Sequence, residues 1–167
     1  MRNIFGVVLL GCALSACAGS GSTSQVTPAR AEIDSRGVAE VTVTSAISGG
    51  DKIAAELQTE IVNQIISKRV FRAVKLGPEP ADVRIEAKLT EANDVSQAGR
   101  ILLGGLAGQA KVQADVKIVD SKTGNLLAEI IATGLSSGGD VFAGTSREAI
   151  RETATQITDY VLRNRKL

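Results

Sequence analysis

The sequence predicts an α+β fold, a two-layer sandwich in which two helices pack on one face of a mainly antiparallel sheet, in the order β-α-β-β-β-β-α. Some segments alternate apolar and polar residues, two others repeat apolar residues at helical spacing, and glycine- and proline-rich breaks separate them. A sheet that is apolar on one face and helices that are apolar along one stripe must bury those surfaces against each other.

The predicted strands have the period of two that is typical of a half-buried strand. Their approximate ranges are 39–47, 71–76, 82–89, 111–118 and 126–135. The alternation is clearest in the third and fourth, which indicates antiparallel strands with one face in water. The turn 120–125 is rich in residues that tolerate tight backbone geometry, so the strands on either side are expected to form a hairpin.

Two segments have the period of an amphipathic helix. The first follows a glycine-rich break and spans about 52–69, with Asp51 as its expected N-cap. The second follows a capping box, in which the side chains of Thr145 and Glu148 satisfy each other's free backbone N–H groups. These helices supply the second layer of the sandwich.

The first seventeen residues have the order of a bacterial lipoprotein signal. Arg2 gives a positive start, residues 4–14 are apolar but too short to span a bilayer, and the tetrapeptide LSAC ends in Cys17. We expect cleavage before Cys17 and its modification by diacylglycerol and N-acyl chains, which together give stable membrane anchoring. Cys12 fits the same pattern loosely, and a free thiol at position 17 is the other alternative.

Three regions are therefore expected: a signal peptide over 1–16, the acylated cysteine with a flexible tether over 17–37, and a single α+β domain over 38–167. The tether is rich in Gly, Ser and Thr and has no hydrophobic period. Ala18, not aspartate, follows the cysteine. The resemblance to outer-membrane lipoproteins implies anchoring on the periplasmic face of that membrane.

Composition argues against several classes of function. Removal of the signal takes away one basic residue, Arg2, and leaves 18 basic and 18 acidic residues. No nucleic-acid partner is expected, because the charge is balanced and the mature chain has only Phe71, Phe142 and Tyr160 as stacking aromatics. The chain has no histidine; Cys12 is removed with the signal, and Cys17 is consumed by acylation. We expect no catalytic residue, no metal site and no cofactor.

Several motifs resemble the bacterial lipoprotein family known as domain of unknown function 4410. They are the run 100–110, the strand end 116–120 with Thr123-Gly124, and the glycine-rich run 138–145. The resemblance covers roughly 51–162 and implies a lipoprotein without an assigned activity. The element order is also similar to the small domains of the curli-secretion lipoprotein and of the lipoprotein activators of penicillin-binding proteins, which is a similarity of fold alone.

The segment 97–109 is too apolar for an ordinary exposed loop, and Gly104 and Gly108 have a spacing that permits close backbone approach. Its leucines either complete the core beneath a short turn or form a contact surface for a partner, a second copy or the bilayer. Phe142 either packs on the following helix or joins that surface. The candidate contact residues are Leu102, Leu103, Gly104, Gly105, Leu106, Gly108 and Phe142.

The sequence thus predicts a non-catalytic envelope module that binds another envelope protein or forms a homo-oligomer. A lipoprotein that holds a small ligand between the sheet and the loop is the alternative. An envelope hydrolase based on carboxylates is the least supported, because the acidic residues are scattered singly along the chain.

Overall fold

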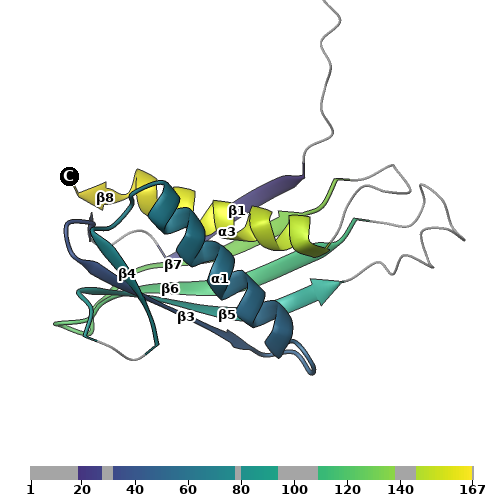
Figure 1. Cartoon of the computed structure of the whole chain (residues 1–167), viewed down its shortest axis with the longest axis horizontal. Coiled ribbons are helices and arrows are strands. Elements are labelled where there is room, and N and C mark those ends of the chain that lie inside the picture. The colour runs from purple at the N-terminus through teal and green to yellow at the C-terminus, as the bar shows by residue number, and fades with distance from the viewer. Residues whose placement is uncertain (1–18, 28–31, 78–79, 94–108, 138–145, 167) are drawn as a thin grey trace, which may run out of the picture.

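The computed structural model describes residues 19–27, 32–77, 80–93, 109–137 and 146–166. In this part of the chain, six strands form one mixed sheet and two long helices cover one of its faces (Figure 1). The predicted α+β two-layer sandwich is confirmed. The elements are β1 (Ser20–Thr27), β2 (Ile33–Asp34), β3 (Val38–Ser45), α1 (Asp51–Ser67), β4 (Ala73–Leu76), β5 (Val83–Asn93), β6 (Lys111–Asp120), β7 (Leu126–Leu135), α3 (Ser146–Arg163) and β8 (Arg165–Lys166).

The strand order of the sheet is β1-β7-β6-β5-β3-β4. Neighbours from β1 to β5 are antiparallel, whereas β3 is parallel to both β5 and β4. The chain returns from β3 to β4 through α1, and such a helical crossover brings the next strand back in the same direction. The sheet is therefore mainly antiparallel with a parallel edge.

The hydrophobic core lies between the sheet and the helices. Alternate residues of the central strands face α1 and α3, and the predicted apolar stripes of both helices face the sheet, as the period of each element requires. The other sheet face carries charged side chains. Fully buried residues of this layer include Val41, Leu57, Ile61, Ile65, Ile85, Val116, Ile130, Ala154, Ile157 and Val161.

Strand register gives the sheet two distinct ends. At one end Asn93 pairs with Lys111, Lys111 with Leu135, and Leu135 with Ser20. We call this the loop end, because the segments 94–108 and 138–145 join the sheet here. α3 begins here, and α1 begins just after Ser45, which pairs with Leu89 near the same end.

The opposite end is named the turn end. There Val38 pairs with Ala73, and Val83 lies between Ala39 of β3 and Asp120 of β6. The predicted hairpin turn joins β6 to β7 here. The Asp120 carboxylate accepts hydrogen bonds from the backbone N–H groups of Lys122 (2.8 Å) and Thr123 (3.0 Å), which hold its pKa below the usual value.

Residues expected to be tether form part of the sheet. Ser20–Thr27 pairs antiparallel with β7 as strand β1, and Ile33–Asp34 pairs with β8. The prediction of a flexible tether is wrong over these residues. β1 is an edge strand whose inner side meets polar groups of α3, where Thr23 Oγ1 donates to Gln156 Oε1 (3.1 Å). A strand that packs on polar side chains needs no apolar period.

The start of α1 also differs from the expectation. Asp51 is the first residue of the helix, and Gly50 occupies the N-cap without a side-chain hydrogen bond. Gly50 N donates to Ile47 O (3.2 Å) while Gly50 O accepts from Ala54 N (2.9 Å), so the turn passes directly into the helix. The negative charge of Asp51 interacts favourably with the partial positive charge at the start of α1, although its side chain does not cap the helix.

At the loop end, a buried serine ties β6 to the residues that follow β7. Ala110 N donates to Ser136 Oγ (2.9 Å), and Ser136 N donates to Ala110 O (2.9 Å). Both residues are fully buried. The pair fixes the positions at which the two glycine-rich segments meet the sheet.

Replacement Ser136→Ala is expected to lower the free energy of unfolding by about 1–3 kcal/mol, because the buried Ala110 N–H loses its acceptor. Urea unfolding followed by circular dichroism measures the change. Ser22→Ala, at an exposed position of β1, is the control and is expected to leave stability nearly unchanged. Equal stability of the two variants would contradict the assigned role of Ser136.

At the turn end, Asp82 joins β3 to the hairpin turn. Its Oδ2 accepts from Val38 N (2.9 Å) and its Oδ1 pairs with Lys122 Nζ (2.9 Å). The hydrogen bond from Val38 and then the Lys122 ammonium hold the pKa of Asp82 below 3.8. A carboxyl whose pKa is lowered by folding stabilises the fold above its unfolded pKa and loses that contribution as pH falls through the folded value.

We expect Asp82→Asn to reduce stability at pH 7, and the difference from wild type to shrink as pH falls below about 3.8. Urea midpoints measured between pH 7 and pH 2 test this. Lys122→Gln is the matched control: it removes the ion pair but keeps the bond from Val38, so it should retain the larger part of the pH dependence. A pH-independent difference between wild type and Asp82→Asn would refute the assignment.

Candidate functional site

All the site residues predicted from sequence lie outside the described residues. They are Cys17, Leu102, Leu103, Gly104, Gly105, Leu106, Gly108 and Phe142. The described residues that flank them do have defined positions. These positions show where each segment joins the fold.

Three chain segments meet the fold at the loop end. The segment 94–108 follows Asn93 and precedes Gln109, while 138–145 follows Ser137 and precedes α3. The chain that follows Cys17 enters β1 at Ser20, which is paired with Leu135. The segments that bear the candidate contact residues and the cysteine predicted to be acylated are therefore attached to the same end of the sheet.

The carboxylate of Glu148 joins two of these attachments. Its Oε1 accepts from Gly19 N (2.9 Å) and its Oε2 accepts from Ser137 Oγ (2.9 Å). The sequence predicted a capping box between Glu148 and Thr145, and Thr145 lies outside the described residues. In the part of the chain that is described, Glu148 connects the entry of β1 with the exit of β7.

The outer face of the sheet carries opposite charges in alternation. Glu86 of β5 lies opposite Lys117 of β6, Lys88 lies opposite Asp115, and Lys117 Nζ is 3.9 Å from Glu129 Oε1. A hollow of about 830 Å³ lies over these residues. Because the side chains are solvated and of both signs, each pair contributes little to stability and the face has no strong preference for one sign of ligand.

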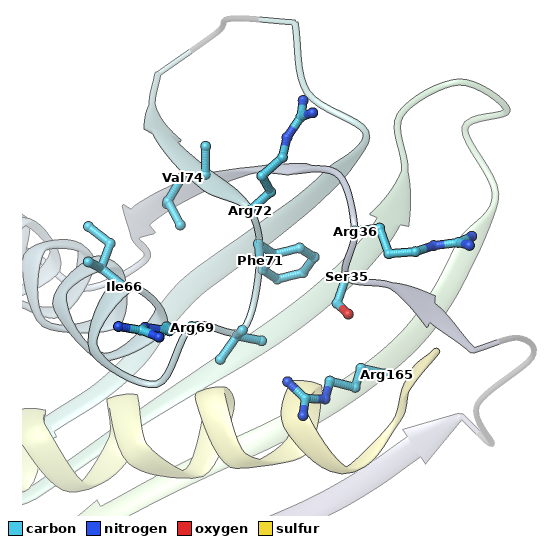
Figure 2. A pocket seen from close by; sticks show the side chains of 10 residues that line it. Ser35, Arg36, Ile66, Arg69, Phe71, Arg72, Val74 and Arg165 are labelled. Carbon is cyan, nitrogen blue, oxygen red and sulfur yellow. The ribbon is translucent and has the colours of Figure 1, made fainter. Parts of the chain in front are cut away.

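A second hollow, the arginine pocket, lies at the turn end. It has a volume of about 560 Å³ and lies between the end of α1, the start of β4 and the β2–β8 pair (Figure 2). Its residues are Ser35, Arg36, Ile66, Arg69, Val70, Phe71, Arg72, Ala73, Val74 and Arg165. Four arginines and no acidic side chain among ten residues make this an electropositive site.

The four arginines play different parts. Arg36 forms a two-point ion pair with Asp34, with Nε–Oδ1 and Nη2–Oδ2 both at 2.9 Å, which lowers the pKa of Asp34 to about 2. Figure 2 shows that the Arg36 and Arg72 side chains point away from Phe71, whereas Arg165 extends from β8 toward the end of α1, where Arg69 lies. Arg69 therefore lines the hollow from the α1 side and Arg165 lines it from the β8 side.

The chain leaves α1 in a Schellman turn. Val70 N donates to Ile65 O (3.0 Å) and Arg69 N donates to Ile66 O (3.1 Å). Arg69 stands at the position after the helix cap, with φ 51°, the left-handed region where glycine is usual. Among the residues that the structure describes, Arg69 is the only non-glycine residue with a positive φ. The backbone thus accepts a strained arginine at the edge of the pocket.

Sequence reasoning missed the arginine pocket. Its cations come from four places, Arg36, Arg69, Arg72 and Arg165, and only the fold brings them together. A local signal did exist in the sequence, because a helix that ends in Lys68-Arg69 lacks the glycine expected after its cap. The described residues contain no cluster of His, Cys, Asp and Glu suited to a metal ion, and no described helix has the length and apolar character to cross a bilayer.

Solved structures share this fold. Two structures of a PelC dodecamer from Paraburkholderia phytofirmans match with TM-scores of 0.59 and 0.56, at 19% and 18% identity, over 87% of this chain and 99% of that chain. Protein XCC0632 from Xanthomonas campestris, of the family DUF330, matches with a TM-score of 0.52 at 14% identity, over 81% of this chain and 86% of that chain. At such identities the likeness is one of fold.

The comparison with protein families assigns the chain to a family, whereas the solved structures show only its fold. A comparison with curated proteins finds no match. The family described as "Domain of unknown function (DUF4410)" matches residues 25–137, which include part of β1 and all the strands from β3 to β7. This chain belongs to that family, as the sequence predicted, although the match begins before the expected range of 51–162 and ends before the glycine-rich run 138–145.

Proposed function

We propose that this protein is a non-catalytic lipoprotein of the bacterial outer membrane, anchored through Cys17 on the periplasmic face, that acts as an assembly module by self-association or by binding another envelope protein. One observation carries the proposal. The pairing of Ser20 with Leu135 attaches the anchor segment and both glycine-rich segments to the same end of the sheet.

The short distance from anchor to fold gives the proposal its geometry. Two residues, Ala18 and Gly19, separate Cys17 from Ser20, and an extended chain over these three Cα-to-Cα steps spans at most about 11 Å. The loop end therefore stays close to the membrane surface. β1 is paired with β7 over its whole length. The domain would therefore be held with its loop end toward the membrane, and no long tether would separate it from the anchor.

Self-association is favoured over an isolated role by the composition of the loop-end segments. Leu102, Leu103, Leu106 and Phe142 belong to two segments that join the same end of the fold, and apolar side chains of this kind would favour contact with another protein if they are exposed together. The PelC structures of the same fold are dodecamers. A homo-oligomer held at the loop end, beside the membrane, is the arrangement we infer.

A non-catalytic role is supported by the chemistry of the chain. It has no histidine, and acylation leaves no mature thiol. Among described carboxylates, the pKa values of Asp34, Asp82 and Asp120 are held low by hydrogen bonds and cations. A general acid near neutral pH needs a raised value.

Replacement Cys17→Ser is expected to abolish acylation and membrane association. Incorporation of labelled palmitate, followed by separation of membranes from soluble fractions, measures both. Cys12→Ser is the matched control and should keep the label and the membrane localisation. Loss of label in Cys12→Ser with retention in Cys17→Ser would move the anchor and contradict the proposal.

Photocrosslinking from position 103 of the acylated protein in cells is expected to give adducts with a second copy or with one defined envelope protein. Leu103→Asp should weaken that association at least about tenfold, as expected for a central apolar contact. Leu76→Asp, at a leucine that is 59% exposed on β4, is the control and should leave it unchanged. Absence of adducts, with position 103 protected from solvent labelling, would assign the segment to the core.

A further inference from the structure

We propose that the arginine pocket binds a soluble organic oxyanion, a small molecule that joins a phosphate or carboxylate group to an apolar body. The guanidinium groups of Arg69 and Arg165 would hold the oxyanion, and Ile66, Phe71 and Val74 would contact the body. The inference goes beyond assembly at the membrane, since it concerns the other end of the fold and a different kind of partner.

The first argument is the backbone at Arg69. A residue with a β-carbon at φ 51° costs free energy that glycine would avoid, and glycine is the usual residue at this point of a Schellman turn. Strain of this kind is maintained at binding sites, where the side chain is needed. The observation therefore assigns the Arg69 side chain a purpose other than stability of the turn.

The second argument is uncompensated charge. Within the described part of the chain, Arg36 is paired with Asp34, and the charge of Arg72 acts on the Asp82 carboxylate, whereas Arg69 and Arg165 form no ion pair. Guanidinium groups bind phosphate and carboxylate through paired, charge-assisted hydrogen bonds. They also offset the partial negative charge at the end of α1, which would otherwise repel an anion.

The third argument is shape. A volume of about 560 Å³ lies in the range of small-molecule sites, and Val70 and Phe71 give the hollow a buried apolar wall. Ile66, which is 59% exposed, adds apolar surface at the rim of the hollow. An inorganic ion alone would leave that apolar surface in water, so an organic ligand fits better.

The fourth argument concerns the source of the ligand. α1 runs from the loop end to the turn end, and β6, with ten residues, spans roughly 30 Å between them. If the anchor is at Cys17, the arginine pocket faces away from the membrane that holds it. Lipid headgroups of that leaflet are out of reach, so the ligand is dissolved in the surrounding compartment.

Calorimetric titration of the full acylated protein in a non-ionic detergent, at low salt, tests the proposal with phenyl phosphate, benzoate and inorganic phosphate as probes. Phenyl phosphate or benzoate should bind more tightly than inorganic phosphate. Arg69→Gly should weaken that binding at least tenfold and yet raise the urea midpoint, because it removes both the cation and the backbone strain. Arg165→Gln should weaken binding without raising the midpoint.

Arg151→Gln, at an exposed arginine of α3 outside the pocket, is the control and should change neither quantity. Binding that survives Arg69→Gly and Arg165→Gln unchanged would overturn the proposal, as would the absence of binding by all three probes. So would capture of phosphatidylglycerol vesicles through the same arginines by protein that ignores the soluble probes. Repeating the titration with Cys17→Ser separates this outcome from failure of the anchoring proposal, because the pocket does not depend on the lipid.

Discussion

Burial of one sheet face beneath α1 and α3 is the constraint on which the rest of the structure depends. The helices pack side by side along the strands, with Gln64 of α1 donating to Arg151 O and Thr155 Oγ1 of α3, both at 3.1 Å. Because both helices begin near the loop end and finish at the turn end, their C-termini lie together at the turn end. The arginine pocket forms there, and the other sheet face is left to solvated charges.

If the chain is anchored through Cys17 as proposed, β1 gives this layered fold a fixed orientation relative to the membrane. A tether would have left the orientation free, but an edge strand paired with β7 fixes the point at which the chain enters. Entry at Ser20 puts the anchor segment beside Glu148, whose carboxylate bonds both Gly19 and Ser137. Under the proposed anchoring, the loop end lies beside the bilayer and the turn end lies in the aqueous compartment.

Sequence patterns predicted the elements whose two sides differ. β5 and β6 alternate strictly because one side faces the core and the other faces water, and the helices show their stripes for the same reason. β1 gave no such signal, since its inner side meets Gln156 and Tyr160 instead of an apolar core. The arginine pocket could not be predicted from the sequence, because its arginines lie far apart along the chain. Only the packing of the folded elements brings them together.

Arg69 shows how such a site is maintained at the expense of the fold. With glycine at this position the Schellman turn would keep both of its backbone hydrogen bonds, Val70 N to Ile65 O and Arg69 N to Ile66 O, and lose the strain of a left-handed arginine. The stability of the turn alone would therefore favour glycine over arginine at position 69. The side chain is explained if its contribution appears on binding, when an oxyanion in the pocket pairs with the Arg69 and Arg165 guanidinium groups through charge-assisted hydrogen bonds.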